Sequence, residues 1–295
     1  MRSQPIVAAI GEVLWDVYPD AARFGGAPAN FACTARALAA DAPLVSAVGI
    51  DELGDRAIET LNTHDVDTTC IQRDPACATG QVSVALDAAG RPTYTIAEDS
   101  AWDHIHWTDS LATLARQADA VCFGTLAQRS RESRDTIRRF VGATQPGTVR
   151  MFDVNLRQNF FDAATVDASL QLASAMKLNE EELPTVARLC GVRATDRAEL
   201  LRGLVTKYEL RVAALTRGPD GALLMTPDGE SECSAVPTKV QDTVGAGDAF
   251  TATMVIDFLR GVPLAAINQH ANAVASFVCS HAGAVVPIPA ELRSP

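Results

Sequence analysis

The chain has 295 residues, of which 47% are hydrophobic and 21% charged, a composition typical of a globular protein. Its formal net charge of −11 at pH 7 argues against a surface for nucleic acid or anionic membranes, but it does not exclude ATP, which local donors bind. No run of 18 apolar residues is free of charge, and the apolar run at 5–10 is too short for a signal peptide, so we expect a cytoplasmic protein.

Cysteine and histidine give no sign of a metal site in the sequence. No two of the seven cysteines form a C-x-x-C pair, and the five histidines show no metal-ligand spacing. Most of the cysteines lie among apolar neighbours, so we interpret them as small buried side chains. The sequence therefore predicts neither a zinc site nor a redox motif.

Apolar runs alternate with helical patterns along most of the chain. Continuous apolar runs predict buried parallel strands at 5–10, 43–49, 118–124, 149–154, 175–179 and 212–216. Helices are predicted from about 27 to 40 and at about 51–64, 130–143, 249–259 and 263–281, with another that starts on the glutamates at 180–182. A polar run at 236–241 is compatible with a strand, and 221–235 predicts a hairpin. This alternation is typical of one Rossmann-like α/β domain, with a mostly parallel sheet and helices on both faces.

A different pattern interrupts the alternation between residues 81 and 97. Val82, Val84 and Leu86 alternate with smaller or polar residues, and Tyr94 and Ile96 do the same beyond a turn at 87–92. Period-two alternation predicts a sheet with one face open to water. We therefore expect a small β lid, built from segments near 12–24 and 67–98, as an insertion in a single domain that spans 1–295.

The clearest chemical pattern is Asp242-Thr243-Val244-Gly245-Ala246-Gly247-Asp248, which opens an apolar helix. Two glycines around a small residue let the backbone approach a ligand, and the first amides of a helix have no partner within it. Gly245 to Gly247 therefore predict an anion hole, favoured by the helix dipole. Asp248 should weaken anion binding, but it makes sense if it accepts a proton from a hydroxyl that attacks phosphorus. Alternatively, Asp248 only stabilises the helix N-terminus.

Other polar residues follow predicted strands, where open α/β sheets bind ligands. Asp16 follows the first strand, and Gly25-Gly26-Ala27-Pro28-Ala29-Asn30 opens a helix with paired glycines and an amide that can bind hydroxyls. Each of these could also be an ordinary turn. At another strand end, Arg157 could bind a phosphate bidentately, or could pair with Asp153 or Glu181.

Three segments, taken in order, resemble the motifs of the PfkB/ribokinase family of carbohydrate kinases. They are 25–30, the central run Lys177-Leu178-Asn179-Glu180-Glu181-Glu182, and 242–248, and the resemblance covers nearly the whole chain. It implies a ribokinase fold with a small β lid, and ATP-dependent phosphorylation of a sugar hydroxyl in the presence of Mg2+.

The resemblance also implies a role for each candidate residue. Asp248 would be the catalytic base, and Gly245, Ala246 and Gly247 would form the anion hole. The sugar would be bound by Asp16, Gly25, Gly26, Asn30 and Arg157. ATP and Mg2+ would lie against Asn179, Glu182, Thr216, Gly218 and Asn272, with Glu182 reaching the metal through water. A potassium ion (K+) would lie near Asp242 and the loop at 280–283.

Within the family, the segments at 11–16, 25–30 and 153–157 look most like bacterial fructokinases. Ribose, a nucleoside and 2-keto-3-deoxygluconate stay open as other substrates of the same chemistry. Many members carry an arginine near position 98, where this chain has Glu98, so the roles of Glu98 and Trp102 in substrate choice stay open. A non-catalytic sugar or nucleotide sensor is the alternative from another class, and the intact Asp248 argues against it. The expected partners are a sugar, ATP and a second subunit bound through the lid.

Overall fold

The computed structural model describes residues 4–18, 20–86 and 92–295. Nine strands in this part of the chain form one sheet in the order β13-β12-β11-β10-β9-β8-β1-β4-β5, in which all pairs from β5 to β11 are parallel. Their bounds are β1 (Val7–Ile10), β4 (Leu44–Gly49), β5 (Ile71–Asp74), β8 (Ala120–Gly124), β9 (Val149–Asp153), β10 (Ala175–Asn179), β11 (Val212–Thr216), β12 (Ala222–Thr226) and β13 (Gly229–Cys233). The predicted α/β fold with a mostly parallel sheet is confirmed.

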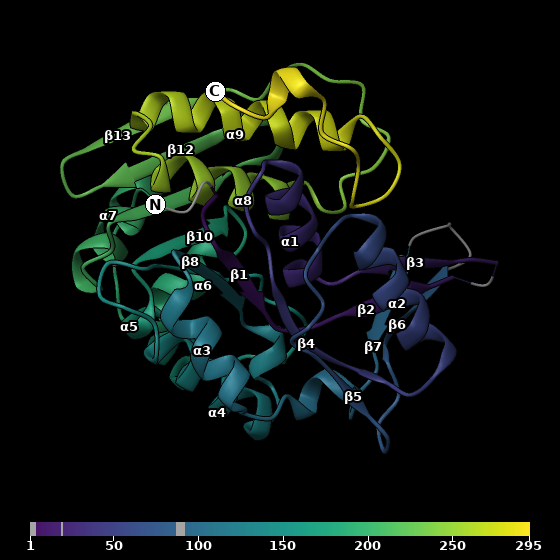
Figure 1. Ribbon diagram of the computed structural model, residues 1–295. Helices are drawn as coiled ribbons and strands as arrows, with labels where there is room; N and C mark the ends of the chain where they lie inside the picture. The colour runs from purple at the N-terminus through teal and green to yellow at the C-terminus, as the bar shows by residue number, and fades with distance from the viewer. Residues whose placement is uncertain (1–3, 19, 87–91) are drawn as a thin grey trace.

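Helices cover both faces of this sheet because its strands are apolar on both sides. Val7 and Ala9 pack with one group of helices, and Ala8 and Ile10 pack with the other. The first group is α1 (Ala27–Ala37), α2 (Glu52–Thr63), α8 (Ala246–Leu259) and α9 (Leu264–Cys279). The second is α3 (Asp109–Gln117), α4 (Arg131–Gly142), α5 (Ala163–Leu172), α6 (Leu183–Leu189) and α7 (Arg197–Lys207). Figure 1 shows the two groups on opposite sides of the sheet. None of the described helices has both the length and the apolar character needed to cross a membrane.

A second sheet of four strands lies beside the large one, at the right of Figure 1. Its order is β3-β2-β6-β7, with the bounds β2 (Leu14–Val17), β3 (Ala22–Gly25), β6 (Gly80–Leu86) and β7 (Pro92–Ile96). Val82, Val84 and Ile96 are buried, whereas Ser83 between the two valines is exposed, as the alternation predicts. Residues 71–74 of the expected lid segment instead form β5, which pairs with β4 in the large sheet. Most of the predicted turn at 87–92 lies outside the described residues.

Two local predictions were wrong. Residues 236–241 form no strand, since Pro237 has no amide hydrogen to donate and the segment follows the edge of the cavity described below. The glutamates at 180–182 precede α6 rather than open it. The Asn179 side chain accepts hydrogen bonds from the amides of Glu181 and Glu182, at 2.9 Å each, and so holds these residues in a turn.

Candidate active site

A cavity of about 1370 Å³ lies where the C-terminal ends of β1, β9, β10 and β11 meet the small sheet and the first turn of α8. Ligands of open α/β sheets bind at such strand ends. Most of the residues proposed from the sequence line this cavity: Asp16, Gly25, Gly26, Asn30, Arg157, Asn179, Thr216, Gly218, Gly245, Ala246, Gly247, Asp248 and Asn272. Residues far apart in the sequence therefore meet in one site.

The first turn of α8 has the geometry of an anion site. Gly245 caps the helix with φ of 79°, and a side chain there would collide with the carbonyl oxygen of Ala284. The Gly245 carbonyl accepts the first hydrogen bond of the helix, from the Ala249 amide at 2.8 Å. The amides of Gly247 and Asp248 lie before this first bond, so they have no acceptor within the helix. The Ala246 amide makes a long hydrogen bond of 3.4 Å to the Thr243 carbonyl. These first-turn donors can bind an anion at the cavity wall.

Asp248 and Asn30 join the two glycine motifs. The Asn30 amide nitrogen Nδ2 donates to Oδ2 of Asp248 at 2.8 Å, across a sequence separation of 218 residues. The Asn30 oxygen Oδ1 and the Glu12 oxygen Oε2 are buried with no hydrogen-bond partner within the protein, and both side chains line the cavity. Leaving such atoms unpaired is costly, so a polar ligand that donates hydrogen bonds fits here.

Two carboxyl groups in the cavity have pKa values close to neutrality. Burial, together with the negative charge of Asp153, raises the pKa of Asp248 to about 7. Burial also raises the pKa of Glu12 to about 7, and the nearby Asp248 contributes. A carboxylate with a pKa near neutrality is suited to act as a general base, because it is both ionised and basic at that pH.

A buried ion pair supports the anion site from behind. Lys177 Nζ lies 3.1 Å from Asp153 Oδ1, and the Thr251 hydroxyl donates to Asp153 Oδ2 at 2.8 Å. Burial lowers the pKa of Lys177, but the charges of Asp153 and Glu182 outweigh it and hold this pKa above its usual value. An ideal Cβ on Gly247 would lie 3.0 Å from Lys177 Nζ, so the ammonium group lies directly beside the first turn of α8. Lys177 therefore adds a positive charge to the anion site.

On the side of the small sheet, polar groups and glycine backbone face the cavity. A Cβ on Gly26, whose φ is 108°, would come within 2.5 Å of the Glu12 carbonyl oxygen. Burial raises the pKa of Asp16, although Arg157 and Arg23 counteract it. Arg157 is exposed and lines the cavity. It makes neither of the ion pairs considered from the sequence, and Asp153 pairs with Lys177 instead. The Arg157 side chain donates a hydrogen bond to the Leu156 carbonyl at 3.3 Å.

The opposite side of the cavity is wide and partly apolar. Val236, Val240 and Val244 line it with 46%, 58% and 41% of their surfaces exposed. Exposed apolar side chains gathered at one cavity fit a flat, weakly polar group such as a nucleobase. Asn272 also lines this side, but its amide nitrogen donates to the carbonyl and side-chain oxygens of Asn268.

Two of the proposed residues do not line the cavity. Glu182 is buried, and its two oxygens accept hydrogen bonds from the amides of Leu156 and Asn179 at 2.8 Å each, which joins the loops after β9 and β10. Asp242 accepts from the amides of Val244 at 3.1 Å and Gly283 at 3.2 Å, and it pairs with Arg23 at 3.7 Å. Asp242 thus holds the turn before α8 against the C-terminal loop.

Our selection of site residues from the sequence omitted Glu12, Lys177 and Asp153, which the cavity and its supporting ion pair bring together. Glu12 directly follows the end of β1, and Lys177 interrupts the apolar run of β10. Both signals were visible. A charged residue inside or directly after a buried parallel strand is unusual, and in open α/β sheets it points to the ligand edge.

An anion site, a carboxylate with a pKa near neutrality and a polar pocket for hydroxyl groups define a phosphoryl-transferring enzyme of the ribokinase type. The chain matches the model of the pfkB family carbohydrate kinases over residues 19–291. It therefore belongs to the PfkB family, and the predicted sugar kinase activity is confirmed at the level of the family.

Known relatives extend this comparison. An uncharacterized sugar kinase from Pyrococcus horikoshii, solved in complex with ATP, is 28% identical and has a TM-score of 0.81, covering 94% of this chain and 93% of that one. A fructokinase of Salmonella typhimurium is 29% identical over 270 residues, which are 87% of this chain and 86% of the relative. An aminoimidazole riboside kinase of Salmonella typhimurium is 25% identical over 307 residues, which are 98% of this chain and 93% of the relative.

Proposed function

We propose that this kinase transfers the γ-phosphoryl group of ATP to a hydroxyl of fructose, with Asp248 as the general base. The observation that carries the proposal is the position of Asp248. Its carboxylate touches Asn30 on the sugar side, its own backbone belongs to the anion-binding turn, and its pKa is about 7. A residue that only stabilised a helix N-terminus would need its place in the first turn, but neither the contact with Asn30 nor the raised pKa.

The proposed step balances as follows. The sugar hydroxyl oxygen forms a bond to the γ-phosphorus while the bond between this phosphorus and the β,γ-bridging oxygen breaks, and ADP leaves with that oxygen. The hydroxyl proton passes to Asp248. The amides of the Gly245–Gly247 turn and Lys177 stabilise the charge on the phosphoryl oxygens. Asp16, Asn30 and Glu12 hold the other sugar hydroxyls, and the backbone of Gly25 and Gly26 allows close approach.

ATP would occupy the apolar side of the cavity, along Thr216, Gly218 and Asn272, with its phosphates directed at the turn before α8. Mg2+ keeps much of its water shell and binds chiefly to phosphate oxygens, so a protein need supply few ligands. Asn179 lines the cavity and Glu182 lies behind it, and each Glu182 oxygen keeps a lone pair beyond its amide bond. These two residues fit a site in which Glu182 orients metal-bound water.

Fructose is favoured by the fructokinases among the relatives, while Glu12 and Asp16 offer acceptors for the hydroxyls of any of these substrates. Ribose, a nucleoside and 2-keto-3-deoxygluconate remain the alternatives. The aminoimidazole riboside kinase among the relatives supports the nucleoside. A sugar acid would need a cation for its carboxylate, and Arg157 is a cation that faces this cavity. The test is an assay coupled to ADP release over fructose, ribose, adenosine and ketodeoxygluconate. A kcat/KM for any other sugar above that for fructose would replace fructose as the substrate.

The activity should depend on pH through the carboxyl groups of the cavity. Since the base must be ionised, kcat/KM should rise with pH through an apparent pKa of about 7 and then level off. The charge of Asp248 contributes to the raised pKa of Glu12, so the two carboxyl groups repel one another when both are ionised. Glu12→Gln removes a negative charge beside Asp248 and should move the acid limb to lower pH. A limb that stays in place in this variant would show that Glu12 does not influence the base.

Potassium should raise the activity if a cation lies near Asp242. The Asp242 carboxylate already holds the turn before α8 against the loop that contains Gly283. A cation at this point would steady the turn that carries the anion-binding amides. We expect a higher kcat in potassium than in tetramethylammonium at the same ionic strength. Equal rates in the two buffers would remove the potassium site from the proposal.

The small sheet should act as a lid over the sugar and as a dimer interface. Val82, Tyr94 and Ile96 line the cavity, and Tyr94 is 49% exposed. Phosphoryl transfer must exclude water, and a second copy of the sheet would cover further apolar surface. Tyr94→Asp should therefore raise KM for the sugar more than for ATP and shift a dimer toward monomer in sedimentation. Thr95→Asp, at the next exposed position on the other face of β7, is the control and should leave both unchanged. If Tyr94→Asp behaves like this control, the sheet is neither lid nor interface.

A further inference from the structure

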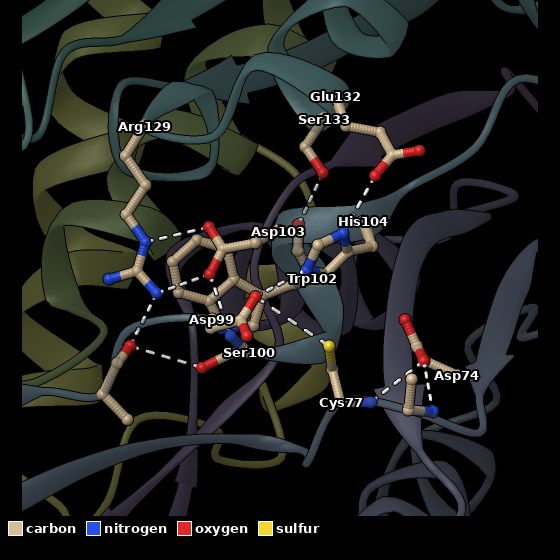
Figure 2. Close-up of polar contacts among 12 residues, drawn as sticks. Asp74, Cys77, Asp99, Ser100, Trp102, Asp103, His104, Arg129, Glu132 and Ser133 are labelled. Carbon is tan, nitrogen blue, oxygen red and sulfur yellow. Dashed lines mark hydrogen bonds and ion pairs between the residues drawn. The ribbon is translucent and has the colours of Figure 1, made fainter.

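We propose that Cys77, Asp99 and His104 bind a zinc ion at the base of the small sheet. One ligand atom from each residue lies within 4.8 Å of the other two. Asp99 Oδ1 is 2.8 Å from His104 Nε2 and 3.9 Å from Cys77 Sγ. Figure 2 shows Asp99 between the cysteine and the histidine. His104 follows Asp99 by only five residues, but Cys77 lies 22 residues before Asp99, and for this reason the spacing of cysteines and histidines did not predict a metal site.

The chemistry of the three donors selects the ion. Thiolate, imidazole and carboxylate are the ligands that Zn2+ prefers, whereas Mg2+ and Ca2+ prefer oxygen atoms alone. Zinc bonds of about 2.0–2.1 Å to N and O and about 2.3 Å to S place neighbouring tetrahedral ligands about 3.3–3.6 Å apart. The sulfur must therefore approach Asp99 by a fraction of an ångström from its 3.9 Å, and the histidine must separate slightly from Asp99. The thiol proton is released when the metal binds, and water fills the fourth position.

Neighbouring residues hold each of these ligands in place. Glu132 Oε2 lies 2.9 Å from His104 Nδ1, which leaves Nε2 directed at Asp99 and Cys77. A carboxylate on the far nitrogen of a histidine is the usual arrangement around protein zinc sites. Asp74 accepts a hydrogen bond from the Cys77 amide at 3.0 Å. The amide of Ser100, next to Asp99, donates to Asp103 at 2.9 Å in a capping box that opens the short helix η1 (Ala101–His104).

The cluster is open to solvent, so an ion can enter it. The Asp99 side chain is 79% exposed and that of His104 is 29% exposed. His104 contacts both Asp99 and Glu132, and His106 makes a second contact with Glu132 at 2.8 Å. These ion pairs account for the histidine and the acids, whereas the Cys77 thiol makes a long hydrogen bond of 3.9 Å to Asp99. A zinc ion uses all three groups at once.

The position of the cluster suggests what the ion does. Cys77 lies just before β6, and Asp99 lies just after β7. His104 belongs to η1, which packs against α4, a helix that covers the large sheet. A bound zinc ion would join the two strands at the end of the pair where β6 begins and β7 ends, and would link them to this helix. It would thus stiffen the base of the sheet that covers the sugar. This consequence depends on the proposed lid, whereas binding of the ion does not.

The test uses the full-length protein, stripped of metal by a chelator and without ATP. Co2+ is the spectroscopic probe, because a thiolate ligand adds a charge-transfer band in the near ultraviolet. Zn2+ is measured by equilibrium dialysis and by its displacement of Co2+. We expect one Zn2+ per chain, a thiolate band with Co2+, and slower amide exchange at 75–80 and 97–100 after zinc is added.

Variants separate this site from adventitious binding. Cys77→Ser should abolish the thiolate band and weaken zinc binding at least about tenfold, as should His104→Gln. Glu132→Gln should weaken it by about 10–100-fold without removing the band, since it alters only the orientation of His104. Cys70→Ser, a nearby cysteine outside the cluster, and Cys233→Ser are the controls and should keep both signals.

Three results would overturn the proposal. They are a wild-type protein that binds no zinc, a Co2+ complex without a thiolate band, and zinc binding that Cys77→Ser leaves unchanged. None of these results would bear on the kinase activity. Conversely, a failed kinase assay would leave the zinc measurements valid.

Discussion

Replacing Asp248 by asparagine lowers kcat by about 10²–10⁴, the range expected when a general base is lost. Asparagine keeps the size of the side chain, and its carbonyl oxygen can still accept the hydrogen bond from Asn30. ATP binding should therefore persist, and it can be measured by calorimetry in the absence of sugar. Turnover close to that of the wild type would exclude Asp248 as the base.

The same substitution should not destabilise the protein at alkaline pH. Folding raises the pKa of Asp248 from 3.8 to about 7, so ionisation of this carboxyl opposes folding above the unfolded value. The asparagine side chain of the variant carries no charge at any of these pH values. The gain in stability of the variant should therefore be absent below about pH 4, grow between about pH 4 and 7, and stay constant above. Thermal unfolding at several pH values tests this sign. A large loss of stability at alkaline pH would mean that the fall in kcat reflects damage to the fold.

The parts of the fold with continuous apolar strands and glycine-bounded helices could be predicted from the sequence. Buried parallel strands such as β8 and β11 have no polar face, so their apolar runs stand out. Three helices that we did not predict, α3, α5 and α7, begin at the side-chain caps Thr108, Asp162 and Asp196. These caps were readable signals in the sequence, because Ser, Thr, Asp and Asn are the residues that most often begin a helix.

The candidate site was predictable where glycine restricts the backbone and less so where charges are buried. Gly245 and Gly26 adopt φ values that other residues avoid, so their motifs mark the turns that face the ligand. The pairing of Lys177 with Asp153 depends on the register of β9 against β10, which places the two residues opposite one another. Nor does the spacing of residues reveal that each oxygen of Glu182 accepts a hydrogen bond from a backbone amide. Such contacts depend on the tertiary structure and cannot be predicted from the local sequence pattern.

Replacing Lys177 by methionine should reduce both stability and activity, and a second substitution should separate the two effects. Lys177 and Asp153 form a buried pair, with side chains 8% and 7% exposed. Removing the lysine leaves an uncompensated buried carboxylate, which costs about 3–5 kcal/mol. We expect the free energy of unfolding to fall by this amount. Lys177→Met combined with Asp153→Asn removes the unpaired buried charge and keeps an acceptor for the Thr251 hydroxyl. The double variant should therefore recover most of the lost free energy of unfolding.

Activity should not recover in this double variant. The ammonium group of Lys177 lies beside Gly247 at the anion site, and loss of one such donor to a transition state costs about 10²–10³ in kcat. Rates should be compared well above the acid limb, because the pKa of Asp248 is lowered by losing the Asp153 charge and raised by losing that of Lys177. Lys207→Met is the control and should keep wild-type kcat. The Lys207 ammonium group donates to the Cys190 carbonyl, on the face of the large sheet opposite to α8. A double variant with wild-type kcat would assign Lys177 a purely structural role as the partner of Asp153. A stable double variant with low kcat would place it among the groups that stabilise the transferring phosphoryl group.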